Sequence, residues 1–344
     1  MHAHSWVRKG SWFAAAITCV ALAAGFAAGG AGARSAHASL TTVTMYLNPG
    51  SADASGAFYC IKSGICKKHG LNVKIKASTQ GGPQIIPALV SGQVQFGEPG
   101  YEDTIVAASK GIPLVAIGPA SVAATSDAAD WTADLSLKSG PVKSLCDLPG
   151  KKVAINSLLG LGQLFVDANY YNAHCKGDPS DTGWKRIKFV AILFPQMATA
   201  LQKGEVDAIW TLEPFLSVTE HQLKTTLLAG SAYRTVPHGP ITAIDVSRSY
   251  LHSNPQIVYQ MQLAMQQSNQ YLAAHPSETR KLIGEDTTTP KSQLAGLILP
   301  TFTATVPLNL VQKEAVFNKM FGLITKIPSL NAYNVPDPIN PKKY

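Results

Sequence analysis

Polar residues and glycines gather at turns that the sequence predicts between strands and helices. Gln80-Gly81-Gly82 stands before Pro83, and Asn156-Ser157 follows a short apolar run. Glycine lets the backbone approach a ligand closely, and a side-chain amide can both donate and accept hydrogen bonds. A tight turn is the alternative explanation of Gln80 to Gly82, but we favour ligand binding there. A helix cap would fully explain Asn156 and Ser157, so both interpretations of this second turn stay open.

Two glutamates each precede a proline where a helix is expected to begin. The dipole of a helix alone stabilises a carboxylate at this position, and we prefer that explanation for Glu213. A carboxylate facing a ligand cleft would repel a bare anion, and none of the predicted strand-to-helix turns contains Arg or Lys. If Glu98 faces the cleft, the ligand therefore carries an amine or a ring N–H.

Aromatic side chains beside these turns are candidates for a wall on which a ligand stacks. Trp210 lies on an apolar strand, where most tryptophans belong to the core. Phe194 adjoins a polar turn and is the better candidate. The complete set of candidate ligand-binding residues is Asn48, Gln80, Gly81, Gly82, Glu98, Tyr101, Asn156, Ser157, Phe194, Gln196, Trp210 and Glu213.

A repeated pattern indicates how these turns are positioned. Residues 88–99 and 200–214 both read Ala-Leu-x-x-Gly-x-Val-[Asp/Gln], an apolar strand and Glu-Pro. Gly92 and Gly204 suit the left-handed residue that follows a helix. In open α/β sheets, ligands bind beyond the carboxyl ends of the strands. The repeat predicts two similar α/β lobes that share a crevice, and coincidence between two ordinary turns is the alternative.

The rest of the chain alternates between predicted strands and helices, which calls for mostly parallel, covered sheets. Residues 120–143 are polar and are expected to cross between the lobes, and residues 328–344 form a proline-rich tail. The expected strands are 42–47, 72–76, 94–97, 113–118, 152–155, 187–193, a short strand that begins at Val206, 226–229 and 241–246. The expected helices are 56–64, 83–91, one that ends at about 110, 161–173, one that opens at Phe194 and runs into Gly204, 255–274, 276–284, 291–298 and 308–325.

Bulk composition bounds the class of protein. The chain has 344 residues, of which 46% are hydrophobic and 15% charged, as expected of a globular protein with up to two domains. Its formal charge of +8 comes from scattered Lys and Arg, so no nucleic-acid stripe is predicted. Gly160-Leu161-Gly162 lacks the third glycine of a dinucleotide loop, and no hydrolase, phosphate-loop or metal-ligand motif is present. We expect no cofactor, no metal and no catalytic residue.

The first 38 residues read as a secretory signal peptide. Arg8 and Lys9 precede the apolar run 11–29, and Ala36-His37-Ala38 is a small-x-small cleavage site. A retained membrane anchor is the less favoured alternative. Cleavage after Ala38 removes Arg8, Lys9 and Arg34 and no acid, so the formal charge falls from +8 to 8 − 3 = +5.

Four cysteines remain in the exported chain: Cys60, Cys66, Cys146 and Cys175. An even number of cysteines in an exported protein favours disulfides over free thiols. Three pairings are possible. We favour 60–66 with 146–175, because each of these bonds would fix one helix end locally.

Several segments together resemble the extracytoplasmic solute-binding proteins of nitrate/sulfonate/taurine-type ABC importers, a group that includes thiamine-precursor-like binding domains. The resemblance covers about residues 40–327 and implies the α/β type II periplasmic-binding fold, with two α/β lobes and a ligand cleft between them. Lobe one would comprise 39–120 and the C-terminal helices 247–327, and lobe two 121–246. The matching segments are Gly64-x-x-Lys67-Lys68-x-Gly70-Leu71-x-Val73, Ala88-Leu89-x-x-Gly92, Lys110-Gly111-x-Pro113, Leu148-x-Gly150-Lys151-Lys152-Val153-Ala154, Ala200-Leu201-x-x-Gly204-x-Val206-Asp207-Ala208, Glu213-Pro214 and Asn254-Pro255.

The resemblance implies a non-catalytic receptor, exported to the periplasm or cell exterior. It would act as a monomer, capture a small polar organic solute such as a sulfonate, taurine or a nitrogen heterocycle, and deliver it to a membrane permease. A desulfinase-like hydrolase with Cys60 as nucleophile and His69 as base is one alternative, and a sensor feeding a membrane receptor is another. The family often has Asp where Gln95 stands and an aromatic residue where Cys66 stands, so a ligand cannot be transferred from any subgroup.

Overall fold

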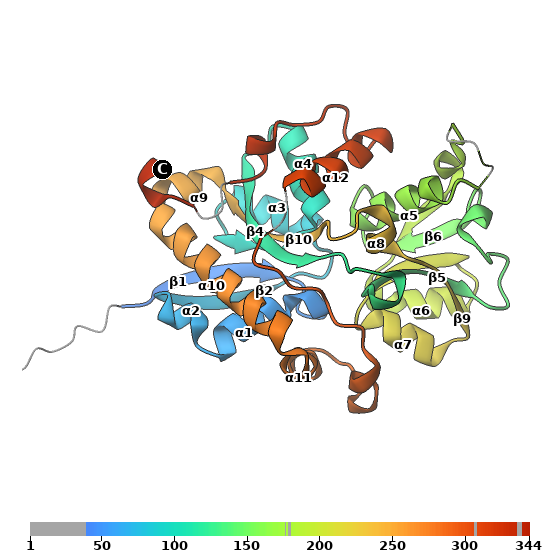
Figure 1. The fold of residues 1–344 in the computed structure, drawn as a ribbon, viewed down its shortest axis with the longest axis horizontal. Helices are drawn as coiled ribbons and strands as arrows, with labels where there is room; N and C mark the ends of the chain where they lie inside the picture. Colours follow the sequence, from blue (N-terminus) through green and yellow to red (C-terminus); the bar gives the residue numbers. More distant parts are fainter. Residues whose placement is uncertain (1–38, 176, 178–179, 306–307, 336–338) are drawn as a thin grey trace, which may run out of the picture. The chain divides into compact units, whose positions relative to one another are not determined.

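The computed structural model describes residues 39–175, 177, 180–305, 308–335 and 339–344, and within them two five-stranded sheets (Figure 1). The first sheet runs in the order β2 (Leu71–Ala77), β1 (Thr41–Leu47), β3 (Phe96–Gly97), β10 (Pro240–Ser247) and β4 (Leu114–Val122). The second runs β7 (Lys188–Ala191), β6 (Lys152–Ile155), β8 (Ala208–Leu212), β5 (Thr132–Leu137) and β9 (Thr225–Gly230). The predicted signal peptide lies outside the described residues.

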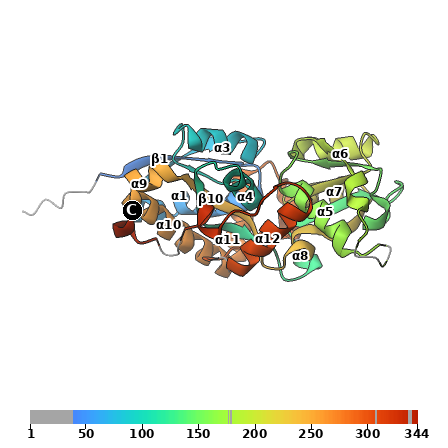
Figure 2. The same ribbon diagram turned by 90° about the horizontal axis from the view of Figure 1, so that it is seen from above.

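Helices cover both faces of each sheet, as Figures 1 and 2 show together. On the second sheet, α5 (Leu161–Asn172) lies over one face and α6 (Phe194–Gln202) over the other. The other helices are α1 (Ser55–Lys62), α2 (Ile65–Lys68), α3 (Gly82–Val90), α4 (Tyr101–Ser109), α7 (Phe215–Gln222), α8 (Ser231–Thr235), α9 (Arg248–Ser253), α10 (Pro255–Ala274), α11 (Pro276–Asp286) and α12 (Leu308–Met320). Among the described residues, no helix has both the length and the apolar character needed to cross a membrane.

The backbone at the repeated motif is as the sequence predicts. Gly92 and Gly204 follow α3 and α6 with φ of +73° and +69°, a conformation that side chains with a Cβ rarely adopt. The strands that follow them, β3 and β8, pair in parallel with β1 and β6. Their carboxyl ends therefore face the same edge as the turns after β1 and β6, which positions the predicted polar turns together.

Two segments differ from the sequence-based expectation. The proposed boundary assigned 241–246 to lobe two, but β10 pairs antiparallel with β3 and β4 and belongs to the first sheet. The stretch 120–143 is not only a crossing, because it contains β5, which pairs antiparallel with β8 and β9. Its polar residues concealed this strand: Asp134 and Ser136 are 2% and 0% exposed, and both find buried partners.

The tail is part of the packed structure. Tyr333 is fully buried, and its carbonyl accepts a hydrogen bond from the backbone N–H of Ala116 in β4. Ile339 lies 2% exposed in the same core as β1 and α10, and its N–H donates to the side chain of Gln262. These contacts attach the end of the chain to the first sheet.

Both favoured disulfides are confirmed. Cys60 in α1 bonds to Cys66 in α2 with an S–S distance of 1.99 Å. Cys146 bonds to Cys175, just beyond the end of α5, at 2.07 Å. Each bond holds one helix end, as expected from the sequence.

Candidate functional site

Turns from both sheets surround one cleft, which encloses about 570 Å³ of empty space including the part open to solvent. The first sheet and its helices contribute the residues that follow β1, β2 and β3, the first turn of α4, and one residue of β10. The second contributes the residue that follows β6, the starts of α5 and α6, and part of β8. The lining residues are Asn48, Ser51, Asp53, Thr79, Gln80, Gly81, Gly82, Glu98, Gly100, Glu102, Asp103 and Thr242 on one side, and Asn156, Leu161, Phe194, Trp210 and Leu212 on the other.

Most of the candidate residues meet in this cleft, although their roles stay predictions. The members that line it are Asn48, Gln80, Gly81, Gly82, Glu98, Asn156, Phe194 and Trp210. Gly81 and Asn156 face each other, because a Cβ on Gly81 would lie 3.8 Å from the Asn156 amide nitrogen. The convergence of strand ends is thus sufficient to bring residues from distant turns together.

Four candidates lie outside the cleft lining, each for a local reason. Tyr101 is buried beside the first sheet, away from the cleft, and its hydroxyl donates to Asn334 at 2.9 Å. Ser157 is buried under Gly160, and Gln196 is exposed on the outer side of α6. Glu213 is fully buried and accepts from the Ser217 hydroxyl at 2.6 Å and the Ile298 N–H at 3.0 Å. Glu213 therefore has a structural role at the start of α7.

Three acidic residues of the cleft were missed by the sequence analysis. Asp53 follows β1, and Glu102 and Asp103 occupy the first turn of α4. Acidic residues in a first helical turn have an ordinary explanation, the helix dipole, and so gave no signal by themselves. Asp53 lies within one predicted strand-to-helix turn, and Glu102 and Asp103 directly follow another that already contains Glu98; this gathering of acids near turns without Lys or Arg is the sequence signal that could have identified them.

Asp53 and Asp103 have hydrogen-bond partners inside the cleft wall. Asp53 accepts from the hydroxyl of Ser51, and burial raises the pKa of the Asp53 carboxyl above its ordinary value. Asp103 accepts from the Gly100 N–H at 3.2 Å and packs against Gly82, where its carboxyl group leaves no room for a Cβ. Burial raises the pKa of Asp103 to about 7.

Glu98 and Glu102 are buried, 7% and 0% exposed, and none of their four carboxyl oxygens has a partner at hydrogen-bond geometry among the described residues. Their polar neighbours are Thr242 beside Glu98 and Asp103 beside Glu102, and each is close enough to influence a pKa in the pair. Burial, and secondarily the charge of Asp53, raises the pKa of Glu98 well above its ordinary value. Burial, followed by the charges of Asp103 and Glu314, does the same for Glu102. Buried polar groups are normally hydrogen-bonded, so both carboxyls are candidates for contact with a ligand.

Aromatic rings form the opposite wall. Phe194 and Trp210 lie with ring centroids 5.7 Å apart and planes tilted by 50°, and Phe194 stacks on Phe215 at 5.5 Å. Phe165 meets the far side of Trp210 edge-on at 6.2 Å. A Cβ on Gly162 would lie 2.6 Å from the Trp210 ring, so a glycine is needed there for α5 to pack on the indole.

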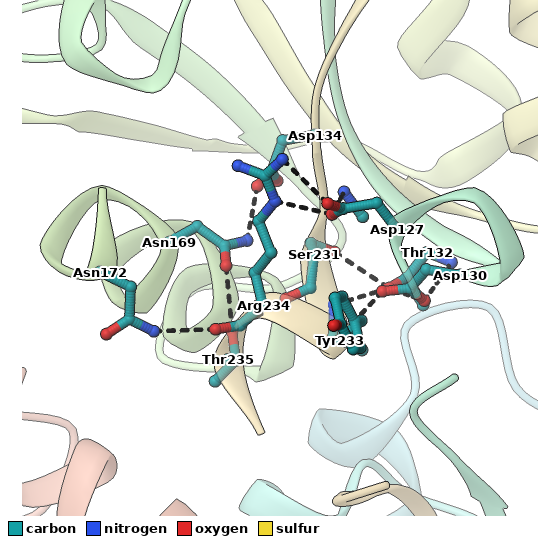
Figure 3. Close-up of polar contacts among 12 residues, drawn as sticks. Asp127, Asp130, Thr132, Asp134, Asn169, Asn172, Ser231, Tyr233, Arg234 and Thr235 are labelled. Atoms are coloured by element: carbon teal, nitrogen blue, oxygen red, sulfur yellow. Dashed lines mark hydrogen bonds and ion pairs between the residues drawn. The ribbon is translucent and has the colours of Figure 1, made fainter. Parts of the chain in front are cut away.

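A polar chain behind the aromatic wall fixes the indole of Trp210. Its Nε1–H donates to the Ser231 hydroxyl at 2.8 Å, which donates to the Thr132 hydroxyl at 3.0 Å. Thr132 in turn donates to Asp130 at 3.0 Å, and Asp130 accepts from the Tyr233 N–H in α8 (Figure 3). Since every donor in this chain has an acceptor, the ring is held in one orientation.

The same network anchors α8 to neighbouring elements. Arg234 forms two charged hydrogen bonds with Asp127, at 2.6 and 2.9 Å (Figure 3). Asn169 in α5 donates to Asp134 in β5 at 2.8 Å. Burial raises the pKa of Asp134 to about 7. The wall of the cleft thus rests on an ordered polar layer rather than on a mobile loop.

Ser231→Ala should loosen this wall. Removing the acceptor leaves the buried indole N–H unpaired, so we expect the free energy of unfolding to fall by about 1–3 kcal/mol. The wavelength of tryptophan fluorescence emission should shift. Comparison of the parent with Trp210→Phe identifies the part of the emission that comes from Trp210. Ser91→Ala removes a hydroxyl that bonds only to a helix carbonyl and should leave the emission unchanged. An unshifted spectrum for Ser231→Ala would contradict the described network.

The described residues contain no group of three or more His, Cys, Asp or Glu side chains arranged to hold a metal ion. Carboxyl, amide, hydroxyl and aromatic groups line the cleft.

Solved structures with this fold include several binding proteins. The alkanesulfonate-binding protein SsuA of Xanthomonas axonopodis, bound to MOPS, is 16% identical with a TM-score of 0.68, covering 87% of this chain and 100% of that one. The nitrate-binding protein NrtA of Synechocystis is 13% identical with a TM-score of 0.68, covering 87% of each chain. The desulfurization enzyme DSZB is 13% identical with a TM-score of 0.59, covering 87% and 97%.

At these identities the likeness shows the fold, and it confirms the predicted periplasmic-binding architecture of two α/β lobes. No curated protein matches the sequence. A family match, however, spans residues 51–279, which is more than half of the chain. The protein is therefore a member of the NMT1/THI5-like family.

Proposed function

We propose that the protein is the extracytoplasmic receptor of an ABC importer, which captures a small polar organic solute and presents it to a membrane permease. The observation that carries this proposal is a cleft whose polar lining comes from both sheets, with Gly81 opposite Asn156. A solute that contacts both sides favours the closed state over the open one. Family membership and the binding proteins that share the fold support the same function.

The division of the chain into lobes follows from the sheets. We propose that the first lobe contains residues 39–122 and 240–344, and the second 123–239, because β4 and β10 both belong to the first sheet. The segments between β4 and β5 and between β9 and β10 would then be the connections that bend on closure. This boundary replaces the one expected from the sequence.

A bare anion is not the solute that this lining favours. Two of the proteins that share the fold are named as alkanesulfonate-binding and nitrate-binding proteins. Among the described residues, none that lines the cleft is Lys, Arg or His, whereas the buried Glu98 offers two carboxyl oxygens. A solute with N–H groups would supply the missing donors.

The alternatives gain less support. A desulfinase-like reaction would need the thiol of Cys60, but this side chain is fully buried, bonded to Cys66, and absent from the cleft lining. A receptor that signals rather than delivers would use the same cleft. Permease and ATPase genes beside the gene for this chain would favour the importer.

Gln80→Ala tests whether this cleft binds the solute. Gln80 lines the cleft, and its side chain is exposed in the protein without solute. The truncation should therefore leave the melting temperature of the empty protein nearly unchanged. It should weaken binding by about 1–3 kcal/mol, because a ligand atom loses its buried partner. The solute is first identified by native mass spectrometry of gently purified protein, and its affinity is then measured by titration calorimetry.

Gln196→Ala is the matched control, because it removes the same side chain from an exposed position of α6 outside the cleft lining. It should bind like the parent protein. Equal affinities for the parent and both variants would refute the assignment of the solute to this cleft.

A further inference from the structure

The cleft concentrates carboxyl groups without any basic side chain. Asp53, Glu98, Glu102 and Asp103 line it, and no Lys, Arg or His is among the described lining residues. Carboxylates that share a buried site raise one another's pKa, since like charges repel strongly where water is excluded. The empty cleft therefore cannot hold all four groups as carboxylates.

Two helix N-termini that could bind an anion already face the chain's own carboxyl groups. Asp103 packs against Gly82 at the start of α3, which has nine residues. Glu102 approaches the start of α5, where a Cβ on Gly160 would lie 3.5 Å from its Oε1. N-terminal amides attract negative groups, so an incoming anion would have to displace these carboxyls and would meet their charge.

The charged side chains that pack behind the cleft do not neutralise its carboxyl groups either. The charged groups that face these carboxyls from the packed elements are also acidic: Glu314 of α12 is 1% exposed and Asp245 of β10 is fully buried. Asp245 accepts a hydrogen bond from Thr104 of α4. Tyr101 and Tyr333 are the remaining titratable neighbours, and burial raises both of their pKa values. Every titratable group that the structure places against the cluster from α4, β10 and α12 is thus neutral or negative.

The aromatic wall suits a positive charge. Trp210 and Phe194, from elements of the second sheet, line the same cleft as Glu98 and Glu102. A cation gains energy over the face of such rings, most strongly over tryptophan and where water is excluded. Carboxyls on one side and aromatic faces on the other would hold the same cationic group.

We propose, on the basis of the receptor function above, that the empty cleft stores protons on its carboxyl groups and exchanges them for an organic cation such as a protonated amine or amidine. In the exchange, a carboxylic acid loses its O–H proton to solvent. The resulting carboxylate then accepts hydrogen bonds from the N–H groups of the cation, which keeps its own protons. One positive charge leaves the cleft for each that enters.

The exchange predicts how binding depends on pH. A proton released on binding makes the cation bind about tenfold more tightly for each unit of rising pH, while the carboxyl is protonated in the empty cleft. The dependence begins at the pKa of the carboxyl in the complex, which the bound cation lowers, and for Asp103 it ends at about 7, its pKa without ligand. Burial raises the pKa values of Glu98 and Glu102 as well, so they contribute in the same direction.

Stability of the empty protein should change in the opposite direction. A folded-state pKa above the unfolded value gives stability that is complete below the unfolded pKa and is lost as pH rises through the folded pKa. The melting temperature of the empty protein should therefore fall as the pH rises from about 4 to about 7, the ordinary and the folded-state pKa of Asp103. The melting temperatures of Glu98→Gln and Glu102→Gln, which carry a neutral side chain of similar shape, should fall less over the same range.

Thermal unfolding across this range tests the proton store without any ligand. Glu205→Gln is the matched control, because that side chain is 58% exposed and pairs only with Lys203 at the surface. It should follow the parent curve. Two results would overturn the proton store. One is a parent melting temperature that stays level or rises with pH, and the other is a melting temperature of the Gln variants that falls as steeply as that of the parent.

Three probes of similar shape test the charge of the ligand: benzamidinium, neutral benzamide and benzenesulfonate. At about pH 6.5, where Asp103 is still largely protonated without ligand, benzamidinium alone should raise the melting temperature, and its binding enthalpy should differ between phosphate and bis-Tris buffers because protons are released. Failure of benzamidinium to do so overturns the cation assignment, whatever the other probes do. Stabilisation by benzenesulfonate instead would leave the receptor function standing, whereas the receptor function itself fails if the purified solute binds outside this cleft.

Discussion

Trp210→Ala should abolish detectable ligand binding and lower the free energy of unfolding by about 3–5 kcal/mol. The indole is 1% exposed, lines the cleft, and packs between Phe165 and Phe194. Its loss would leave a cavity beside the proposed site and remove the donor to the Ser231 hydroxyl, which would keep only its bond to Thr132. Binding should be lost because the indole lines the cleft and also supports Phe194, whose ring centroid lies 5.7 Å from its own.

Trp131→Ala separates these two effects. Trp131 is an equally buried tryptophan of the same core, and its indole N–H also has a partner, the carbonyl of Val122 at 3.2 Å. It does not line the cleft. Chemical denaturation should show a similar loss of stability for both variants, while titration calorimetry on folded protein should show binding by Trp131→Ala alone. Parent-like binding by Trp210→Ala would exclude the indole from the site.

The turns that form the cleft could be located from the sequence because strand ends converge by topology. Gln80 and Glu98 follow strands of the first sheet and Asn156 follows a strand of the second, yet all three residues line one cleft. The rule needs only the alternation of strands and helices. It does not require knowledge of any side-chain contact.

Individual side chains within a turn were harder to assign, because helical geometry decides their direction. Phe194 and Gln196 stand two positions apart at the start of α6, and such residues point to different sides of a helix. Phe194 enters the cleft, whereas Gln196 faces solvent. At the start of α4 the reverse occurred: Tyr101 was chosen and turns into the core, while Glu102 and Asp103 line the cleft.

Strand β5 shows why a strand that buries polar residues is hard to recognise from the hydrophobic pattern of the sequence. Asp134 and Ser136 make this central strand look like a surface segment, but their partners are Asn169 and the carbonyl of Val142. Asn169 is 35 positions further along the chain. Only the folded structure shows that such groups are satisfied and can therefore be buried.

The disulfide between Cys146 and Cys175 should be a large local source of stability. Replacing both cysteines by serine should lower the free energy of unfolding by about 3–4 kcal/mol, because the bond closes a 29-residue separation and restricts the unfolded chain. The bond holds the carboxyl end of α5, whose first residue, Leu161, lines the cleft. A helix of 12 residues is about 18 Å long, so ligand affinity should change little.

The Cys60→Ser, Cys66→Ser variant provides the comparison, since that bond closes a separation of only 6 residues. By the same chain-entropy reasoning its loss should be smaller, about 2 kcal/mol. Denaturant midpoints for the two variants and the parent measure both effects, and titration calorimetry in the absence of denaturant measures the affinity. If removal of the Cys146–Cys175 bond left the midpoint unchanged, the bond would not restrict the unfolded chain. If it removed binding while the fold persisted, α5 would have to be positioned by the disulfide rather than by its packing on Trp210.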